Sequence, residues 1–240
     1  VSYSELGMII EEDINFCEQC TNPIGPHAIA INDITNDLYT ASINSDFIFH
    51  IDYFNNQVLN QVSLDGDEGA IPDLTTKKFK PIQCSLSDEF LFITCQGGTW
   101  VNGNEDINGQ VMMFNRNNLE FISKYEFSSD SGPWHIVIDT LSSRIYVALS
   151  GEFLGGGQGV ACLSYSSNSL DLFWHNENID GSMEAPHGIS LSSDRMKLFV
   201  SDRSNGIIYL LDSQTGNLIT KKTLGPGNRL GGIANTSNIW

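Results

Sequence analysis

The sequence is poor in basic side chains, because 12 Lys and Arg stand against 29 Asp and Glu and give a formal net charge of −17. Such a negative field repels phosphate backbones and anionic headgroups, which argues against nucleic-acid and membrane-surface binding. No apolar run reaches the ~18 residues that a membrane-spanning helix needs. The GxSxG, HExxH and P-loop motifs are also missing, so no familiar catalytic signature identifies an enzyme class.

The sequence has few cysteines, and their number is odd. The five cysteines are Cys17, Cys20, Cys84, Cys95 and Cys162. An odd count leaves one thiol unpaired unless it pairs between chains or binds a metal. Cys17 and Cys20 have CxxC spacing, but no histidine follows for haem attachment and no second CxxC completes a zinc knuckle. A local disulfide and two plain thiols both remain open for this pair.

What the chain does have is enough apolar material for a folded core, since 40% of its residues are hydrophobic and 10% aromatic. Runs of β-branched and aromatic residues alternate with turns rich in Asn, Asp, Ser and Gly, which predicts strands. A 3.6-residue apolar period persists almost nowhere. The composition therefore indicates an all-β globular protein.

One pattern occurs in four full copies and a partial fifth. The copies open at Gly25–Ile31, Pro81–Leu86, Gly132–Ile138, Pro186–Leu191 and Gly231–Ala234. Their equivalent positions are Ile29, Cys84, Ile136, Ile189 and Ile233, which are 55, 52, 53 and 44 residues apart. A repeat of this length predicts stacked supersecondary units.

Each full copy is expected to hold four strands, the first being its opening segment. The second strands are expected at 37–40, 90–93, 144–147 and 197–200. The third are expected at 47–51, 111–114, 160–163 and 207–211, and the weaker fourth at 57–59, 120–122, 170–173 and 217–219. Four antiparallel strands every ~45–55 residues are typical of β-propeller blades. A single such sheet cannot bury both faces, whereas radial stacking lets each blade cover the next.

The fourth copy carries a family resemblance. It runs from Pro186-His187-Gly188-Ile189 through Lys197–Asp202 to Asn205-Gly206-Ile207-Ile208-Tyr209 and resembles the YVTN/NHL-type β-propeller repeat. The likeness extends over roughly residues 25–240. It departs from the usual pattern because the Pro-Asp-Gly turn is replaced, as by Ser193-Asp194. The resemblance implies the fold but leaves function open, because that group spans lyases, lactonases, electron-transfer partners and binding scaffolds.

The predicted blade boundaries leave two arrangements open. The copies cover approximately 25–79, 80–131, 132–184, 185–228 and, in part, 229–240. In the favoured arrangement, residues 1–24 complete the last blade and close a five-bladed ring. In the alternative, the chain is a piece of a longer propeller whose other blades are missing or come from another chain.

Candidate site residues gather at the starts of the innermost strands. His27 and His187 share one repeat position, which Ile82, Trp134 and Leu230 occupy in the other copies, and His135 follows Trp134. The resemblance implies that the loops between second and third strands share this end. The candidate binding residues of this mouth are His27, Trp100, Trp134, His135, Glu152, His187 and Asp202.

Two kinds of metal site are conceivable from the residue types. Neutral imidazoles of His27, His135 and His187 could hold a transition metal, with a water or substrate completing the site. Hydrogen-bonded structural histidines are the alternative. The oxygen donors Asn102, Asn104, Asp106 and Asn108 precede Gly109 faintly like a calcium loop, but no downstream bidentate Glu follows. Solvated loop residues explain this second group as well.

Three functions are carried forward. The first is an extracellular or periplasmic binding or scaffold module that presents its loop-rich face to a protein or small molecule. The alternative is a metal-assisted lyase or lactonase-like hydrolase with the histidines at the mouth and Glu152 as acid or base. The second alternative is a subunit of a larger extracellular assembly. Export is inferred from the family resemblance and from a sequence that begins at Val1.

Overall fold

The structure is a computed structural model of the 240-residue chain. It describes residues 2–4, 7–9, 25–66, 79–98, 107–151, 157–177, 179–225 and 230–233, the first two ranges by their backbone alone. These residues form four four-stranded antiparallel sheets and one two-stranded sheet. No helix that could cross a membrane occurs in these ranges.

Each four-stranded sheet falls within one copy of the repeat and is called a blade. Blade I is β3 (Pro26–Asn32), β4 (Asp37–Ser42), β5 (Phe47–Asp52) and β6 (Gln57–Ser63). Blade II is β7 (Pro81–Leu86), β8 (Phe90–Cys95), β9 (Gln110–Asn115) and β10 (Phe121–Glu126). Blade III is β11 (Pro133–Asp139), β12 (Arg144–Leu149), β13 (Gly159–Tyr165) and β14 (Leu170–Asn176). Blade IV is β15 (Pro186–Leu191), β16 (Lys197–Asp202), β17 (Ile207–Asp212) and β18 (Leu218–Thr223).

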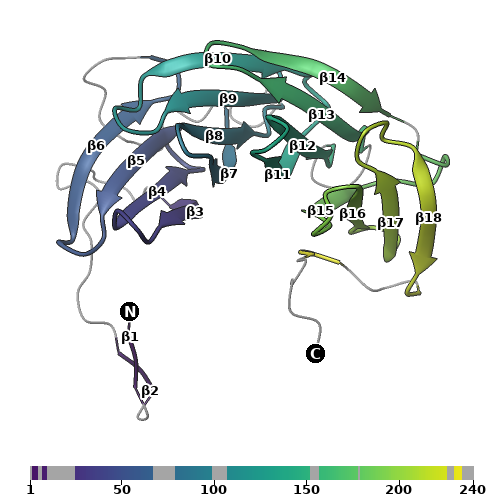
Figure 1. The fold of residues 1–240 in the computed structure, drawn as a ribbon, viewed down its shortest axis with the longest axis horizontal. Helices are drawn as coiled ribbons and strands as arrows, with labels where there is room; N and C mark the ends of the chain where they lie inside the picture. Colours follow the sequence, from purple (N-terminus) through teal and green to yellow (C-terminus); the bar gives the residue numbers. More distant parts are fainter. Residues whose placement is uncertain are drawn as a thin grey trace.

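Within every blade the strands pair in sequence order, so each blade is a meander. Figure 1 shows the four blades side by side around an axis, with β3, β7, β11 and β15 innermost and β6, β10, β14 and β18 outermost. Neighbouring innermost strands contact one another from β3 to β7, β7 to β11 and β11 to β15. The all-β propeller architecture predicted from the repeat is confirmed.

Three apolar clusters join the blades and explain why these strands form together. Blades I and II share Tyr39, Ile48, Leu91 and Met112. Blades II and III share Phe92, Met113, Val147 and Leu163. Blades III and IV share Tyr146, Cys162, Leu198 and Tyr209. Because alternate side chains of a strand point to opposite faces, each blade supplies one row of apolar residues to each neighbour.

The four blades form an arc that is open between β3 and β15 in Figure 1. Strands β1 (Ser2–Ser4) and β2 (Gly7–Ile9) pair antiparallel with each other, as expected for two adjacent strands of one blade. Their two-stranded sheet pairs with none of the four blades, and it lies outside the arc. Four complete blades are thus described, and the five-bladed ring completed by residues 1–24 stays a prediction.

Candidate functional site

The predicted histidines converge at one end of the innermost strands, where four rings make the feature called here the histidine mouth: His27, Trp134, His135 and His187. The rings of His135 and His187 are nearly perpendicular, with centroids 4.7 Å apart. Trp134 lies 5.1 Å from His187 and 6.5 Å from His27, again between ring centroids. Residues from β3, β11 and β15 are therefore brought together as the repeat predicted.

Hydrogen bonds between consecutive copies fix the imidazoles. Nδ1 of His27 donates to the carbonyl of Ile82, 2.9 Å away, and Nδ1 of His187 donates to the carbonyl of Gly231 at 2.5 Å. His27, Ile82 and His187 share one repeat position, so the same bond recurs at two places in the arc. Gly231 takes the fifth place in this pattern rather than Leu230, which corrects the sequence alignment by one residue.

The same environment keeps two of the imidazoles neutral. Burial lowers the pKa of His135 to about 4, with smaller contributions from the neighbouring His187 and His27 and an opposing hydrogen bond to the backbone of His187. Burial, assisted by the Arg203 charge, also lowers the pKa of His187. A neutral imidazole that donates through one nitrogen accepts through the other. The mouth therefore presents hydrogen-bond acceptors.

A cavity of about 350 Å³ lies along the axis beside these rings. Its walls come from all five copies of the repeat. They are His27, Ala28, Ile82, Gln83, His135, Ile136, Gly188, Ile189, Gly232 and Ile233. The cavity volume is near the lower end of the ~300–1,000 Å³ range of small-molecule sites.

The backbone under the mouth is held by side chains of the preceding blade. The Gln83 amide accepts from the Ile136 N–H at 2.8 Å and donates to the Ile136 carbonyl at 3.2 Å. Oγ1 of Thr94 donates to the carbonyl of Trp134 at 2.6 Å. These bonds replace the strand partner that an innermost strand lacks on its axial side, so β11 presents Trp134 and His135 from a fixed backbone.

The loops between second and third strands reach the same end, as the family resemblance implied. Gln96, Ser150 and Gly151 line a second, much smaller cavity together with Trp134 and His187. Gly132 has a φ of +54°, and a Cβ there would lie 2.0 Å from the Gly151 carbonyl oxygen. Only glycine fits this close approach, which positions the segment that leads into Trp134.

The remaining predicted site residues are placed differently. Asp202 is fully buried, and its carboxylate accepts from the backbone N–H groups of Glu184, Ser204 and Asn205. This arrangement makes Asp202 a turn-stabilising residue that ties β16 to the chain before β15. Trp100 and Glu152 lie outside the described residues.

The metal predictions stay predictions. Within the described ranges, no three His, Cys, Asp or Glu side chains are arranged to hold a metal ion. The calcium-like segment falls largely outside those ranges, since only Asn108 and Gly109 of it are described. His27 and His187 each bond a backbone carbonyl through Nδ1, which leaves on each ring an Nε2 of the kind that a transition metal takes.

The cysteines offer no reactive thiol in the described part of the chain. Cys84, Cys95 and Cys162 are free and buried. Burial raises the pKa of the Cys162 thiol to about 12 and raises the pKa values of the Cys84 and Cys95 thiols as well. Thiols of this kind are unreactive core residues. Cys17 and Cys20 lie outside the described residues.

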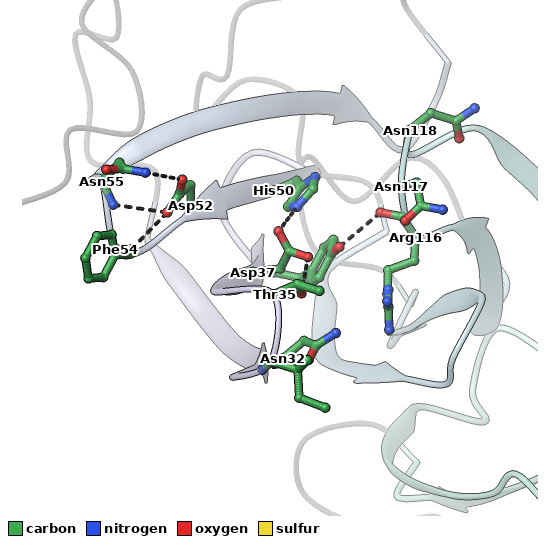
Figure 2. A network of polar contacts seen from close by, with 12 residues as sticks. Asn32, Thr35, Asp37, His50, Asp52, Phe54, Asn55, Arg116, Asn117 and Asn118 are labelled. Carbon is green, nitrogen blue, oxygen red and sulfur yellow. Dashed lines mark hydrogen bonds and ion pairs between the residues drawn. The ribbon is translucent and has the colours of Figure 1, made fainter.

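Sequence reasoning missed one polar network, which Figure 2 shows in blade I. Nε2 of His50 lies 2.8 Å from Oδ1 of Asp37, and the His50 ring stacks on Tyr39 with centroids 4.5 Å apart. The Tyr39 hydroxyl donates to the Arg116 carbonyl of blade II at 3.1 Å. Asp37 lies at the start of β4, opposite Asp52 at the end of β5. The network joins two blades and makes His50 a buried packing residue of blade I.

Comparison with known proteins supports the fold. No family model matches the chain, and no curated protein matches it, so the YVTN/NHL repeat type stays a prediction. Among solved structures, the chain is similar to the β-propeller domain of Cps50 (Swd1) from Myceliophteria thermophila, with a TM-score of 0.61 and 11% identity over 86% of this chain and 57% of that one.

Two bacterial structures are similar to a comparable degree. A protein from Lactobacillus plantarum gives a TM-score of 0.63 and 15% identity over 82% of this chain and 57% of that one. A candidate 6-phosphogluconolactonase of Bacteroides uniformis gives a TM-score of 0.57 and 13% identity over 84% of this chain and 55% of that one. The chain therefore spans a little over half the length of the solved structures that it resembles. Identities this low show the fold alone, which is an all-β propeller.

Proposed function

We propose that this protein is a binding module that recognises its ligand at the histidine mouth and the axial cavity beneath it. The observation that carries the proposal is the convergence of four aromatic rings from three blades at the mouth, two of which, His27 and His135, line an axial cavity walled by five copies of the repeat. A concave site with convergent hydrogen-bonding groups is where a small ligand gains most contact. Positioning bonds from Gln83 and Thr94 preorganise the site before the ligand arrives.

The cavity lining favours binding over acid–base chemistry. Among the described residues, those that line the axial cavity include no carboxylate, lysine, serine or cysteine. Asp202, the one described carboxylate predicted at the mouth, is already engaged by three backbone N–H groups. General acid–base catalysis needs a titratable group within hydrogen-bond reach of the reacting atom. Two imidazoles with lowered pKa values act more readily as acceptors than as acids.

The proposal is tested by thermal-shift screening of a small-molecule library against the full chain. Compounds that raise the melting temperature of the wild type should lose that effect in a Trp134→Ala variant and in a His187→Phe variant. His175→Phe is the matched control, because His175 is a half-buried imidazole on the outermost strand β14 that bonds the Gln158 carbonyl. Ligands that stabilise all four proteins equally would place binding elsewhere.

Metal-assisted hydrolysis, of the lactonase or lyase kind, is the second candidate. It is favoured by the Nδ1 bonds of His27 and His187, because a metal-binding histidine usually donates its other nitrogen to a carbonyl or carboxylate. Metal analysis of untagged protein tests it. Near-stoichiometric transition metal that disappears in a His27→Ala/His187→Ala double variant would support the hydrolase and make lactones the next substrates to screen. Metal-free wild type that binds no added Zn²⁺ would reject it.

Export and assembly remain part of the proposal. The family resemblance supports an extracellular or periplasmic location. Participation in a larger assembly is supported by blade I, where Ile29 and Ile31 are largely exposed on the innermost strand. Fractionation of the source cells tests the location. Light scattering at several concentrations tests the assembly, which requires a mass above the 26.5 kDa of this chain.

A further inference from the structure

We infer that the axial cavity takes an uncharged small molecule that donates hydrogen bonds, such as a polyol or a monosaccharide, to the ring nitrogens of His27 and His135. This inference names a ligand class for the site and so rests on the proposed function. It follows from which nitrogen of each ring is already occupied, from the charge of the cavity wall and from its volume.

The hydrogen-bond partner of each imidazole determines what the ring can offer. A carbonyl oxygen only accepts, so the Nδ1 of His27 that bonds the Ile82 carbonyl carries the proton. In the neutral ring Nε2 is then an acceptor. His135 lines the same cavity with its ring nearly perpendicular to that of His187, and a neutral imidazole has one nitrogen that accepts. The cavity wall therefore includes two imidazole side chains that a hydrogen-bond donor can approach.

The other polar side chain in the wall is already satisfied. The Gln83 amide bonds both backbone groups of Ile136 and the Ser85 hydroxyl. The remaining wall residues are Ala28, Ile82, Ile136, Gly188, Ile189, Gly232 and Ile233, whose side chains offer only apolar contact. A ligand that is held here by side chains must accordingly be a donor toward imidazole.

Charge excludes the ionic versions of such a ligand. No Asp, Glu, Lys or Arg side chain is among the described residues that line the cavity, so a bound cation or anion would lose its hydration without gaining an ion pair. The net charge of −17 adds long-range repulsion for anions. A cavity of about 350 Å³ lies near the lower end of the volume range of small-molecule sites and therefore suits a small ligand. Hydroxyl groups of a neutral molecule meet these conditions, because they donate to imidazole without carrying charge.

Isothermal titration of the full chain at neutral pH tests the inference with matched probes. Glucose, galactose and myo-inositol are the neutral probes, while gluconate and glucosamine are charged probes of similar size. At least one neutral probe should bind at least tenfold more tightly than either charged probe. His27→Phe and His135→Phe, which keep a ring but remove the acceptor, should each weaken its binding about tenfold, whereas His175→Phe should leave it unchanged.

A ligand-independent readout guards against variants that merely unfold. Nitrogen NMR of the wild type should show His27 as the Nδ1–H tautomer, because its Nδ1 bonds the Ile82 carbonyl. Tighter binding of a charged probe, no neutral binding at millimolar concentrations, or neutral binding that survives both Phe variants would each overturn the inference. If library compounds of another chemistry depend on Trp134 and His187, the proposed function survives and only this ligand class is lost.

Discussion

Blade III and blade I carry the same repeat but differ in how many neighbours cover them. Blade III contributes to the cluster shared with blade II and to the cluster shared with blade IV. Blade I contributes to one cluster among the described residues, the one shared with blade II. The equivalent residues Ile136 on β11 and Ile29 on β3 show the result, since their exposed fractions are 4% and 61%.

This difference shows that the burial of a side chain in a repeat structure depends on whether a neighbouring blade covers it, and not on its position in the repeat alone. Stability is then approximately a sum of terms for each repeat and for each interface. Blade III takes part in two interfaces and also presents Trp134 and His135 at the mouth. Substitutions in blade III should therefore affect stability and the site together, while equivalent substitutions at the exposed positions Ile29 and Ile31 of blade I should affect neither strongly.

The largest expected effect comes from Ile136→Ala. Ile136 is buried in the cluster between blades II and III, so removing its side chain leaves a cavity and should cost about 2–5 kcal/mol of the free energy of unfolding. Urea denaturation measures it. Ile29→Ala at the equivalent position is the control, and comparable losses in the two variants would show that β3 is covered in solution.

Acid should destabilise the protein through His135. Its pKa falls from 6.5 to about 4 on folding, so the unfolded chain binds the proton more tightly. The contribution of the neutral ring is fully present above pH 6.5 and is lost as the pH falls toward 4, by roughly 3 kcal/mol at most. Melting temperatures of wild type and His135→Phe between pH 7 and 4 measure it.

The wild type should lose more stability over this pH window than the variant does. Carboxylate protonation contributes to both proteins and cancels in the difference. Parallel curves would contradict the placement of His135 in a buried, neutral state.

A smaller loss is expected from Gln83→Ala. This change removes the amide that bonds both backbone groups of Ile136, and an unpaired buried backbone group costs about 1–3 kcal/mol. Hydrogen exchange should show faster exchange at the Ile136 amide. The control is Gln57→Ala on β6, an exposed glutamine at the rim of blade I, which should leave exchange in β11 unchanged.

The smallest expected effect is that of Ile31→Ser, on the innermost strand of blade I. Ile31 is 58% exposed, and surface substitutions of this kind usually change stability by less than ~0.5 kcal/mol. The same variant should reduce any concentration-dependent association seen by light scattering, because it removes apolar surface from that strand. A loss above 2 kcal/mol in urea denaturation would indicate that Ile31 is buried in solution.

Much of the fold was predictable because the apolar pattern repeats. All twelve second, third and fourth strands expected from the repeat occur, and most extend a few residues beyond the expected range, as β6 does to Ser63. Alternation along each strand sets which side chains face a neighbour, and this information is local. The number of blades around the axis depends on how adjacent blades pack, which no single copy encodes.

The site was predictable in part for the same reason. The repeat position identified His27, Trp134 and His187 as neighbours, and the structure brings them together. The repeat position did not reveal that the Asp202 carboxylate accepts hydrogen bonds from three backbone N–H groups. Nor did it reveal that the Gln83 side chain bonds the backbone of Ile136 in place of a neighbouring strand. Such roles depend on contacts 18 and 53 residues away or on turn geometry, and residue type alone does not distinguish them.

The bonds from His27 to Ile82 and from His187 to Gly231 have a consequence for how the molecule can be rearranged. In each case the donor belongs to one copy and the acceptor to the next, so the pattern has a direction around the arc. A single copy excised from the chain would keep its imidazole but lose the carbonyl that fixes the proton on it. Shuffling or deleting copies would therefore change the chemistry of the mouth even where every strand still formed.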